Sequence, residues 1–180
     1  MTTTTNVGLK TLEDLFVREL EEIYDAEHRI GKLLSSVAKA ACCWKLKKRI
    51  LNHQLETESH VMKLERIFRC LDRRTTGKTG ELMMTLVKEG GEITKEFCAS
   101  RDIDPALISF LLKVERFEIQ GYERLVEWAA LLRNPDAGQL LEGILAEEIF
   151  AFQTLSELVC SSGDEQALEE EDMQGGRKAG

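Results

Sequence analysis

Four segments of the sequence carry glutamate or histidine where the spacing of neighbouring apolar residues demands a buried side chain. In the first segment the apolar residues advance by three or four positions at a time, except between Ile23 and Ile30, where Glu27 stands. Glu148 fills an equivalent gap in the last segment. The other polar residues of this kind are His53, Glu56, Thr57 and His60 in the second segment and Glu115, Glu118 and Tyr122 in the third.

Several carboxylates gathered inside a protein would repel one another and lose their hydration, which raises their pKa values. A pair of divalent cations removes this cost because it supplies positive charge to bridging oxygens. Carboxylates with a few imidazoles suit iron or manganese better than zinc or copper. Glu115 and Glu118 are three residues apart, so both can project from one helix face toward the same metal pair. A polar but metal-free core is the alternative interpretation.

The elements that must position these residues are helices. The apolar periodicity predicts long helices over about 11–40, 44–72, 104–134 and 135–161, and a shorter amphipathic helix over about 81–98. Thr11 with Asp14 three residues later forms a capping-box pattern, and Asp104 before Pro105 is typical of a helix cap. The chain is therefore predicted to be all-α.

Short connections near 41–43 and near 134–136 predict two antiparallel helix hairpins. The connection between the hairpins spans about thirty residues and carries the short helix, so it can cross from one end of a bundle to the other. This is the arrangement of a ferritin-like four-helix bundle with one long crossover containing a short extra helix.

The acidic residues of each predicted hairpin lie at similar distances from its turn. Counted from the turn at residue 42, Glu27 lies 15 residues before it and Glu56 lies 14 after it. In the second hairpin, Glu118 lies 16 residues before the turn and Glu148 lies 14 after it. At a rise of about 1.5 Å per residue, each hairpin brings its two carboxylates to the same level within about 3 Å.

Charge and composition exclude several classes of function. The net charge is −8, and the last 18 residues hold six acidic and two basic residues. This balance disfavours nucleic-acid binding. No apolar run approaches the ~18 residues of a membrane span, so no membrane association is expected. Five scattered cysteines without a Cys-x-x-Cys pair, and a start without signal-peptide features, favour a cytoplasmic protein.

The predicted domain organisation is a disordered lead over 1–8, the helical bundle over 9–162 and an acidic disordered tail over 163–180. Within the bundle region the sequence resembles the YciE/YciF stress-protein family of the ferritin-like superfamily. The stretches that carry the resemblance are 9–16 (LKTLEDLF), 24–27 (YDAE), 53–57 (HQLET), 114–122 (VERFEIQGY) and 145–148 (LAEE). The resemblance implies a ferritin-like fold, a homodimer, a di-iron-type site and a role in bacterial stress.

The resemblance also implies a set of metal ligands. The carboxylates that match positions expected of the superfamily are Glu27, Glu56, Glu115, Glu118 and Glu148. Di-iron relatives place a histidine three residues after a glutamate on two helices, but Ser59 and Ala151 stand at those positions here. His53 or His60 could substitute, and Glu147 could replace Glu148 if the last helix is rotated.

Two functional hypotheses follow. In the first, the protein holds two divalent metal ions, iron ahead of manganese, and reacts with dioxygen or peroxide as a di-iron oxidase or peroxidase does. Such turnover would require an external electron donor, because the sequence shows no cysteine cluster for electron transfer. In the second, the protein is a metal-free dimeric helical scaffold that serves the stress response by binding a partner.

Overall fold

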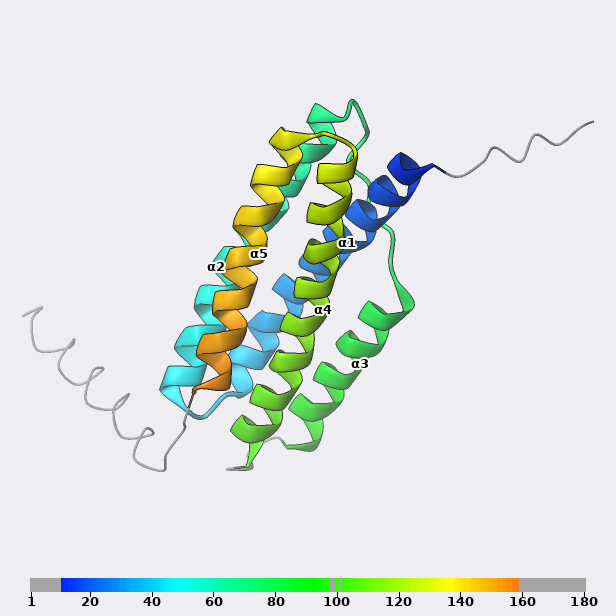
Figure 1. The fold of residues 1–180 in the computed structure, drawn as a ribbon. Coiled ribbons are helices and arrows are strands. Elements are labelled where there is room, and N and C mark those ends of the chain that lie inside the picture. The colour runs from blue at the N-terminus through cyan, green and yellow to red at the C-terminus, as the bar shows by residue number, and fades with distance from the viewer. Residues whose placement is uncertain (1–10, 98–99, 101, 159–180) are drawn as a thin grey trace, which may run out of the picture.

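The computed structural model describes residues 11–97, 100 and 102–158, and within them the chain forms five α-helices and no strand (Figure 1). The all-α prediction is confirmed. The helices are α1 (Leu12–Ala40), α2 (Trp44–Cys70), α3 (Glu81–Glu96), α4 (Ile103–Leu131) and α5 (Pro135–Ser156). None of these helices combines the length and the apolar character that crossing a membrane requires. The predicted lead over 1–8 and tail over 163–180 lie outside the described residues.

Two helix starts follow their sequence signals. The Thr11 hydroxyl accepts the backbone N–H of Asp14, and the Asp14 carboxylate accepts the backbone N–H of Thr11 at 2.8 Å, which completes the predicted capping box of α1. At α5 the Asn134 side chain accepts the backbone N–H of Ala137 at 3.1 Å, and Pro135 occupies the first helical position. These bonds satisfy backbone donors that a helix leaves unpaired at its start.

The start of α4 differs from the prediction. The helix begins at Ile103, one residue before the predicted cap Asp104. The carboxylate of Asp104 instead accepts the backbone N–H groups of Cys42 at 2.9 Å and Cys43 at 2.8 Å. Since α2 has no cap from its own side chains, Asp104 supplies an acceptor at the N-terminus of α2. The bond fixes the α1–α2 turn against the start of α4.

The bundle is built from two antiparallel hairpins, α1 with α2 and α4 with α5. Helix α1 packs on α4 and α2 packs on α5, so the four long helices enclose one core (Figure 1). Helix α3 lies outside the four, against α1 and α4, within the long connection between the hairpins. The predicted four-helix bundle with one crossover is confirmed.

The core consists of two apolar clusters that lie on either side of a layer of buried polar residues. One cluster contains Ile30, Leu34, Leu46, Ile50, Phe110 and Leu111, among others. The other contains Phe16, Leu20, Phe68, Tyr122, Leu125 and Leu141, among others. The polar residues between them come from the middle of each long helix, as the sequence heights predicted.

Helices α1 and α4 approach closely at Gly121, next to the polar layer. A Cβ atom at Gly121 would lie 2.3 Å from Cδ1 of Ile23, whose side chain is buried and stiff. The missing side chain therefore allows α4 to contact α1 one residue before Tyr122.

We expect Gly121→Ala to destabilise the fold by about 1–3 kcal/mol, because Ile23 would have to leave its position in a packed core. The control is Gly143→Ala on α5, where nothing lies within 4 Å of the added Cβ. That change should stabilise the protein by about 0.5–1 kcal/mol through higher helix propensity. Urea unfolding of the two variants measures both effects, and a Gly121→Ala variant as stable as the wild type would contradict the close approach.

Candidate metal centre

Six charged or titratable side chains from all four long helices meet in the middle of the bundle. Each of them is at most 3% exposed. They are Glu27 from α1, His53 and His60 from α2, Glu115 and Glu118 from α4, and Glu148 from α5. Six of the seven predicted metal-binding residues are therefore brought together, and the apolar clusters above and below keep bulk water away from them.

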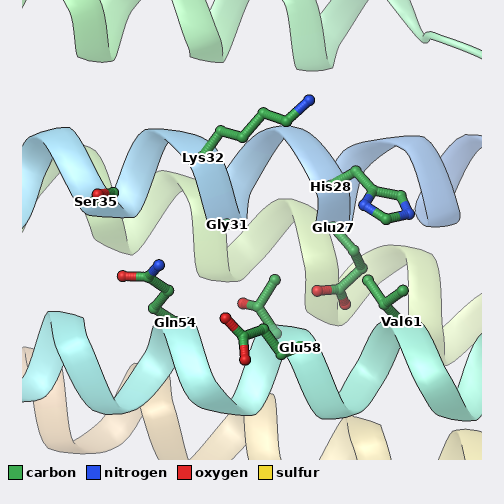
Figure 2. A pocket seen from close by; sticks show the side chains of 9 residues that line it. Glu27, His28, Gly31, Lys32, Ser35, Gln54, Glu58 and Val61 are labelled. Atoms are coloured by element: carbon green, nitrogen blue, oxygen red, sulfur yellow. The ribbon is translucent and has the colours of Figure 1, made fainter.

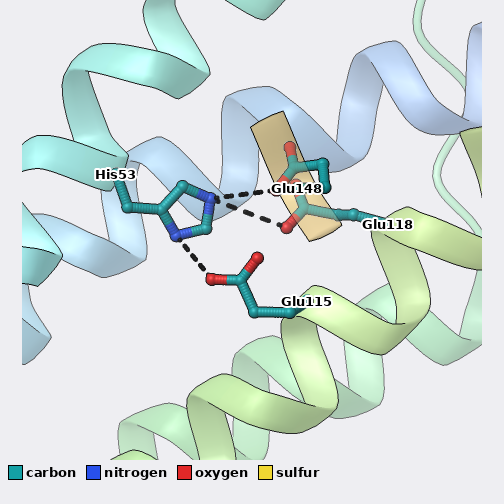
Figure 3. Close-up of side chains that lie close together, drawn as sticks. All are labelled: His53, Glu115, Glu118 and Glu148. Carbon is teal, nitrogen blue, oxygen red and sulfur yellow. Dashed lines mark ion pairs between the residues drawn. The ribbon is translucent and has the colours of Figure 1, made fainter. Parts of the chain in front are cut away.

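The first group contains His53, Glu115, Glu118 and Glu148, each with a ligand atom within 4.8 Å of the others (Figure 3). Nδ1 of His53 lies 3.1 Å from an oxygen of Glu115. Nε2 of His53 lies 3.5 Å from Glu148 and 3.9 Å from Glu118. One imidazole thus faces carboxylates from two other helices, as in a site that holds a cation.

The second group contains Glu27, His60 and Glu148, again within 4.8 Å of one another. Nδ1 of His60 lies 2.9 Å from Oε1 of Glu148 and 3.3 Å from Oε1 of Glu27. Glu148 belongs to both groups, with one oxygen toward His60 and the other toward His53. The two adjoining groups therefore share one carboxylate.

Two contacts outside the groups orient their members. Nε2 of His60 lies 2.8 Å from a carboxylate oxygen of Glu147, which also accepts hydrogen bonds from the Lys63 ammonium. A carboxylate on the outer nitrogen of a histidine directs the other nitrogen toward a metal. The buried hydroxyl of Tyr122 donates a hydrogen bond to Glu27.

The pKa values of the buried carboxylates show that ionising them without a cation is unfavourable. Burial raises the pKa of Glu27, raises the pKa of Glu115 to about 7 and raises the pKa of Glu118 well above its usual range, where Glu148 and other carboxylates add to the effect. Burial therefore shifts three acids in this layer toward their protonated forms.

The histidines respond in the opposite sense. Burial by itself would lower their pKa values, but the facing carboxylates outweigh it and raise the pKa of His53 to about 10 and of His60 to about 11. Burial would also raise the pKa of Glu148, yet the two histidines hold it below its usual range. The metal-free cluster thus holds protons where a metal-loaded cluster would hold cations.

Unpaired atoms provide a test of whether a metal fits. Among the described residues, Oε2 of Glu27, Oε2 of Glu115 and Oε1 of Glu118 are buried and have neither a hydrogen bond nor an ion-pair contact. The facing atoms of His53, His60 and Glu148 make ion-pair contacts only. Native proteins rarely leave such atoms unsatisfied, because each one costs about 1–3 kcal/mol. Oxygen and nitrogen donors at ligand spacing, some of the oxygens without any partner, fit a transition-metal ion.

Glu56 is the predicted ligand that the structure places elsewhere. Its carboxylate is one-third exposed and accepts both terminal nitrogens of Arg49 at 3.0 Å. His53, Thr57 and His60 occupy the buried arc of α2, which leaves Glu56 at the edge of the helix. The expectation that Glu56 joins the cluster is therefore corrected, although its height along the bundle is right.

The sequence left open which of His53 and His60, and which of Glu147 and Glu148, belong to the cluster. Both His53 and His60 lie inside the cluster, one in each group. On α5 Glu148 faces inward, whereas Glu147 is 44% exposed and contacts His60 from outside. The orienting contact of Glu147 was missed by the sequence reasoning, and only its position beside Glu148 hinted at it.

The fold and the cluster together define an all-α, ferritin-like bundle with a buried carboxylate–histidine centre. The chain belongs to the family described as "Domain of unknown function (DUF892)", which matches residues 11–168. It is 28% identical to Protein YciF of Escherichia coli K12 over 165 residues, which cover 89% of this chain and 98% of that protein. The resemblance to the YciE/YciF family is confirmed.

Solved structures agree with this assignment. YcfI from Rhodopseudomonas palustris matches with a TM-score of 0.82 and 28% identity, covering 87% of this chain and 99% of that one. The E. coli stress protein YciF matches with a TM-score of 0.79 and 27% identity, covering 83% and 94%. A Xanthomonas campestris protein with 18% identity and a TM-score of 0.65, covering 92% and 98%, shares the fold.

Proposed function

We propose that this protein is a cytoplasmic, stress-associated ferritin-like protein that binds two divalent metal ions, iron ahead of manganese, in the middle of its bundle. The observation that carries the proposal is the position of Glu148, whose two oxygens face one histidine each in two adjoining groups. The association with stress rests on the similar E. coli stress protein YciF.

The residues of the cluster would have different roles in binding the metal. His53, Glu115 and Glu118 would hold one ion, Glu27 and His60 would hold the other, and Glu148 would bridge them. Glu147 fixes the ring of His60, and Tyr122 fixes the carboxylate of Glu27. The two apolar clusters exclude water, which strengthens every charge interaction inside. An iron pair in this position would supply two electrons for the reduction of dioxygen or peroxide.

A metal-free scaffold is the second candidate. It is favoured by the ion pairs within the cluster, such as His53 with Glu115 at 3.1 Å, which balance part of the buried charge with protons alone. The unpaired atoms of Glu118 weigh against it, because the described residues offer them no hydrogen bond. The homodimer implied by the resemblance and the external electron donor inferred from the sequence stay predictions.

Elemental analysis of the full chain purified without chelator tests the proposal. We expect about two iron or manganese ions per chain, with anomalous scattering from a crystal placing them between His53 and His60. Removing the metal with a chelator should lower the melting temperature, because an ion that binds the folded state stabilises it. Metal-free protein with an unchanged melting temperature in added Fe²⁺ or Mn²⁺ would favour the scaffold.

A further inference from the structure

A pocket of about 520 Å³ lies between α1 and α2, beside the group formed by Glu27, His60 and Glu148 (Figure 2). Its lining includes Glu27 and Thr57, which are both buried, and the exposed side chain of Glu58. The pocket therefore extends from the surface of the bundle to a carboxylate of the candidate metal centre.

Two atoms at the deep end of this pocket lack partners. Oε2 of Glu27 and Oγ1 of Thr57 have no hydrogen bond among the described residues, although both side chains are at least 98% buried. Both are oxygen donors of the kind that replaces a water molecule around an incoming divalent cation.

Oxygen atoms along the pocket suit a cation, and the exposed carboxylate of Glu58 adds negative charge at the mouth. The carboxylates of Glu27 and Glu58 and the amide of Gln54 lie in the gap between the helices (Figure 2). Lys32 also belongs to the lining, but its side chain extends away from α2. Negative charge at the mouth of a cleft concentrates cations there and speeds their association.

Gly31 keeps the gap open on the α1 side. A Cβ atom at this position would lie 3.3 Å from Cγ2 of Thr57, closer than most side-chain contacts. Any larger side chain at Gly31 would extend into the space between the helices, in front of Thr57.

We propose that the α1–α2 pocket is the access route by which a divalent cation reaches the centre, passing Glu58 at the mouth and Thr57 before it meets Glu27. This inference rests on the proposed function, because it requires that the centre binds metal. It goes further in assigning Glu58, Thr57 and Gly31 to delivery of the ion, since none of them belongs to either ligand group.

The rate of Co²⁺ uptake by metal-free full-length protein, followed by stopped-flow absorbance, tests the route. Glu58→Lys should slow uptake about tenfold, because it reverses the charge at the mouth. Glu142→Lys is the matched control, since it makes the same charge change at an exposed position of α5. The amount of Co²⁺ bound at saturation should equal that of the wild type in both variants.

A second variant, Gly31→Leu, obstructs the gap without changing charge and should slow uptake at least tenfold at unchanged saturation. Should this variant fail to fold, the exposed Glu58→Lys change decides the question alone. Wild-type rates in Glu58→Lys, or equal slowing in Glu142→Lys, would overturn the route and leave the metal centre standing. A wild-type chain that takes up no Co²⁺ would overturn the proposed function and the route with it.

Discussion

Replacing Glu148 by glutamine is expected to abolish the binding of both metal ions, with an affinity loss of at least about 100-fold at each position. Glutamine keeps the size of the side chain but cannot supply two anionic oxygens. Because Glu148 faces His53 with one oxygen and His60 with the other, a single change damages both groups. Titration of the metal-free variant with Fe²⁺ or Mn²⁺, followed by calorimetry, measures the loss.

Comparison with Glu27→Gln makes the result specific. Glu27 belongs only to the group of His60, so its variant should lose one ion and keep the other in the group of His53. Glu142→Gln, at an exposed position of the same helix as Glu148, should bind metal like the wild type. If Glu148→Gln folds and still binds two ions at wild-type affinity, Glu148 is not the bridging ligand.

Metal affinity is expected to rise steeply with pH. In the metal-free chain the pKa of His53 is raised to about 10 and that of His60 to about 11, so both carry a proton at neutral pH. A metal ligand must be deprotonated, and each proton that the metal displaces steepens the dependence by about tenfold per pH unit. Two histidine protons alone make the combined affinity for two ions rise about 100-fold per pH unit near neutrality, and protons released by Glu115 and the other raised acids steepen the rise further.

The direction of this effect follows from competition. Raising the pH removes the protons that occupy the ligand atoms, and lowering the pH restores them. Calorimetric titrations at about pH 6 and about pH 8, in buffers of different ionisation enthalpy, count the released protons directly. An affinity that is the same at both pH values would mean that the histidines are already neutral, and that they do not hold protons in place of the metal.

The position of the cluster along the bundle was predictable from sequence because it depends on helix periodicity and chain length alone. Glu27 and Glu148 interrupt otherwise regular apolar series, and the short hairpin turns bring the middles of the helices to one level. The bundle and its crossover follow from the same two facts. Six of the seven predicted ligands meet for this reason.

The exceptions depend on particular side-chain contacts, and two of the three join different parts of the bundle. Glu56 sits at the edge of the buried arc of α2, where its carboxylate pairs with Arg49, seven residues earlier on the same helix. The local sequence predicts Asp104 to be a helix cap. In the structure its carboxylate instead accepts hydrogen bonds from two backbone N–H groups of the α1–α2 turn. The contact between Glu147 and His60 joins residues 87 positions apart. Periodicity within one helix carries no information on the contacts of Asp104 and Glu147.

The layer of charge between two apolar clusters also specifies the alignment of the helices. Apolar side chains pack acceptably in many alignments. The two apolar clusters by themselves would therefore tolerate a shift of one helix along its axis. A slip of α5 by one turn would carry Glu148 about 5.4 Å away from His53 and His60. It would leave a buried charge without its partners, at a cost of about 3–5 kcal/mol. The residues that would hold the metal thereby give this bundle a unique register, whether or not an ion is bound.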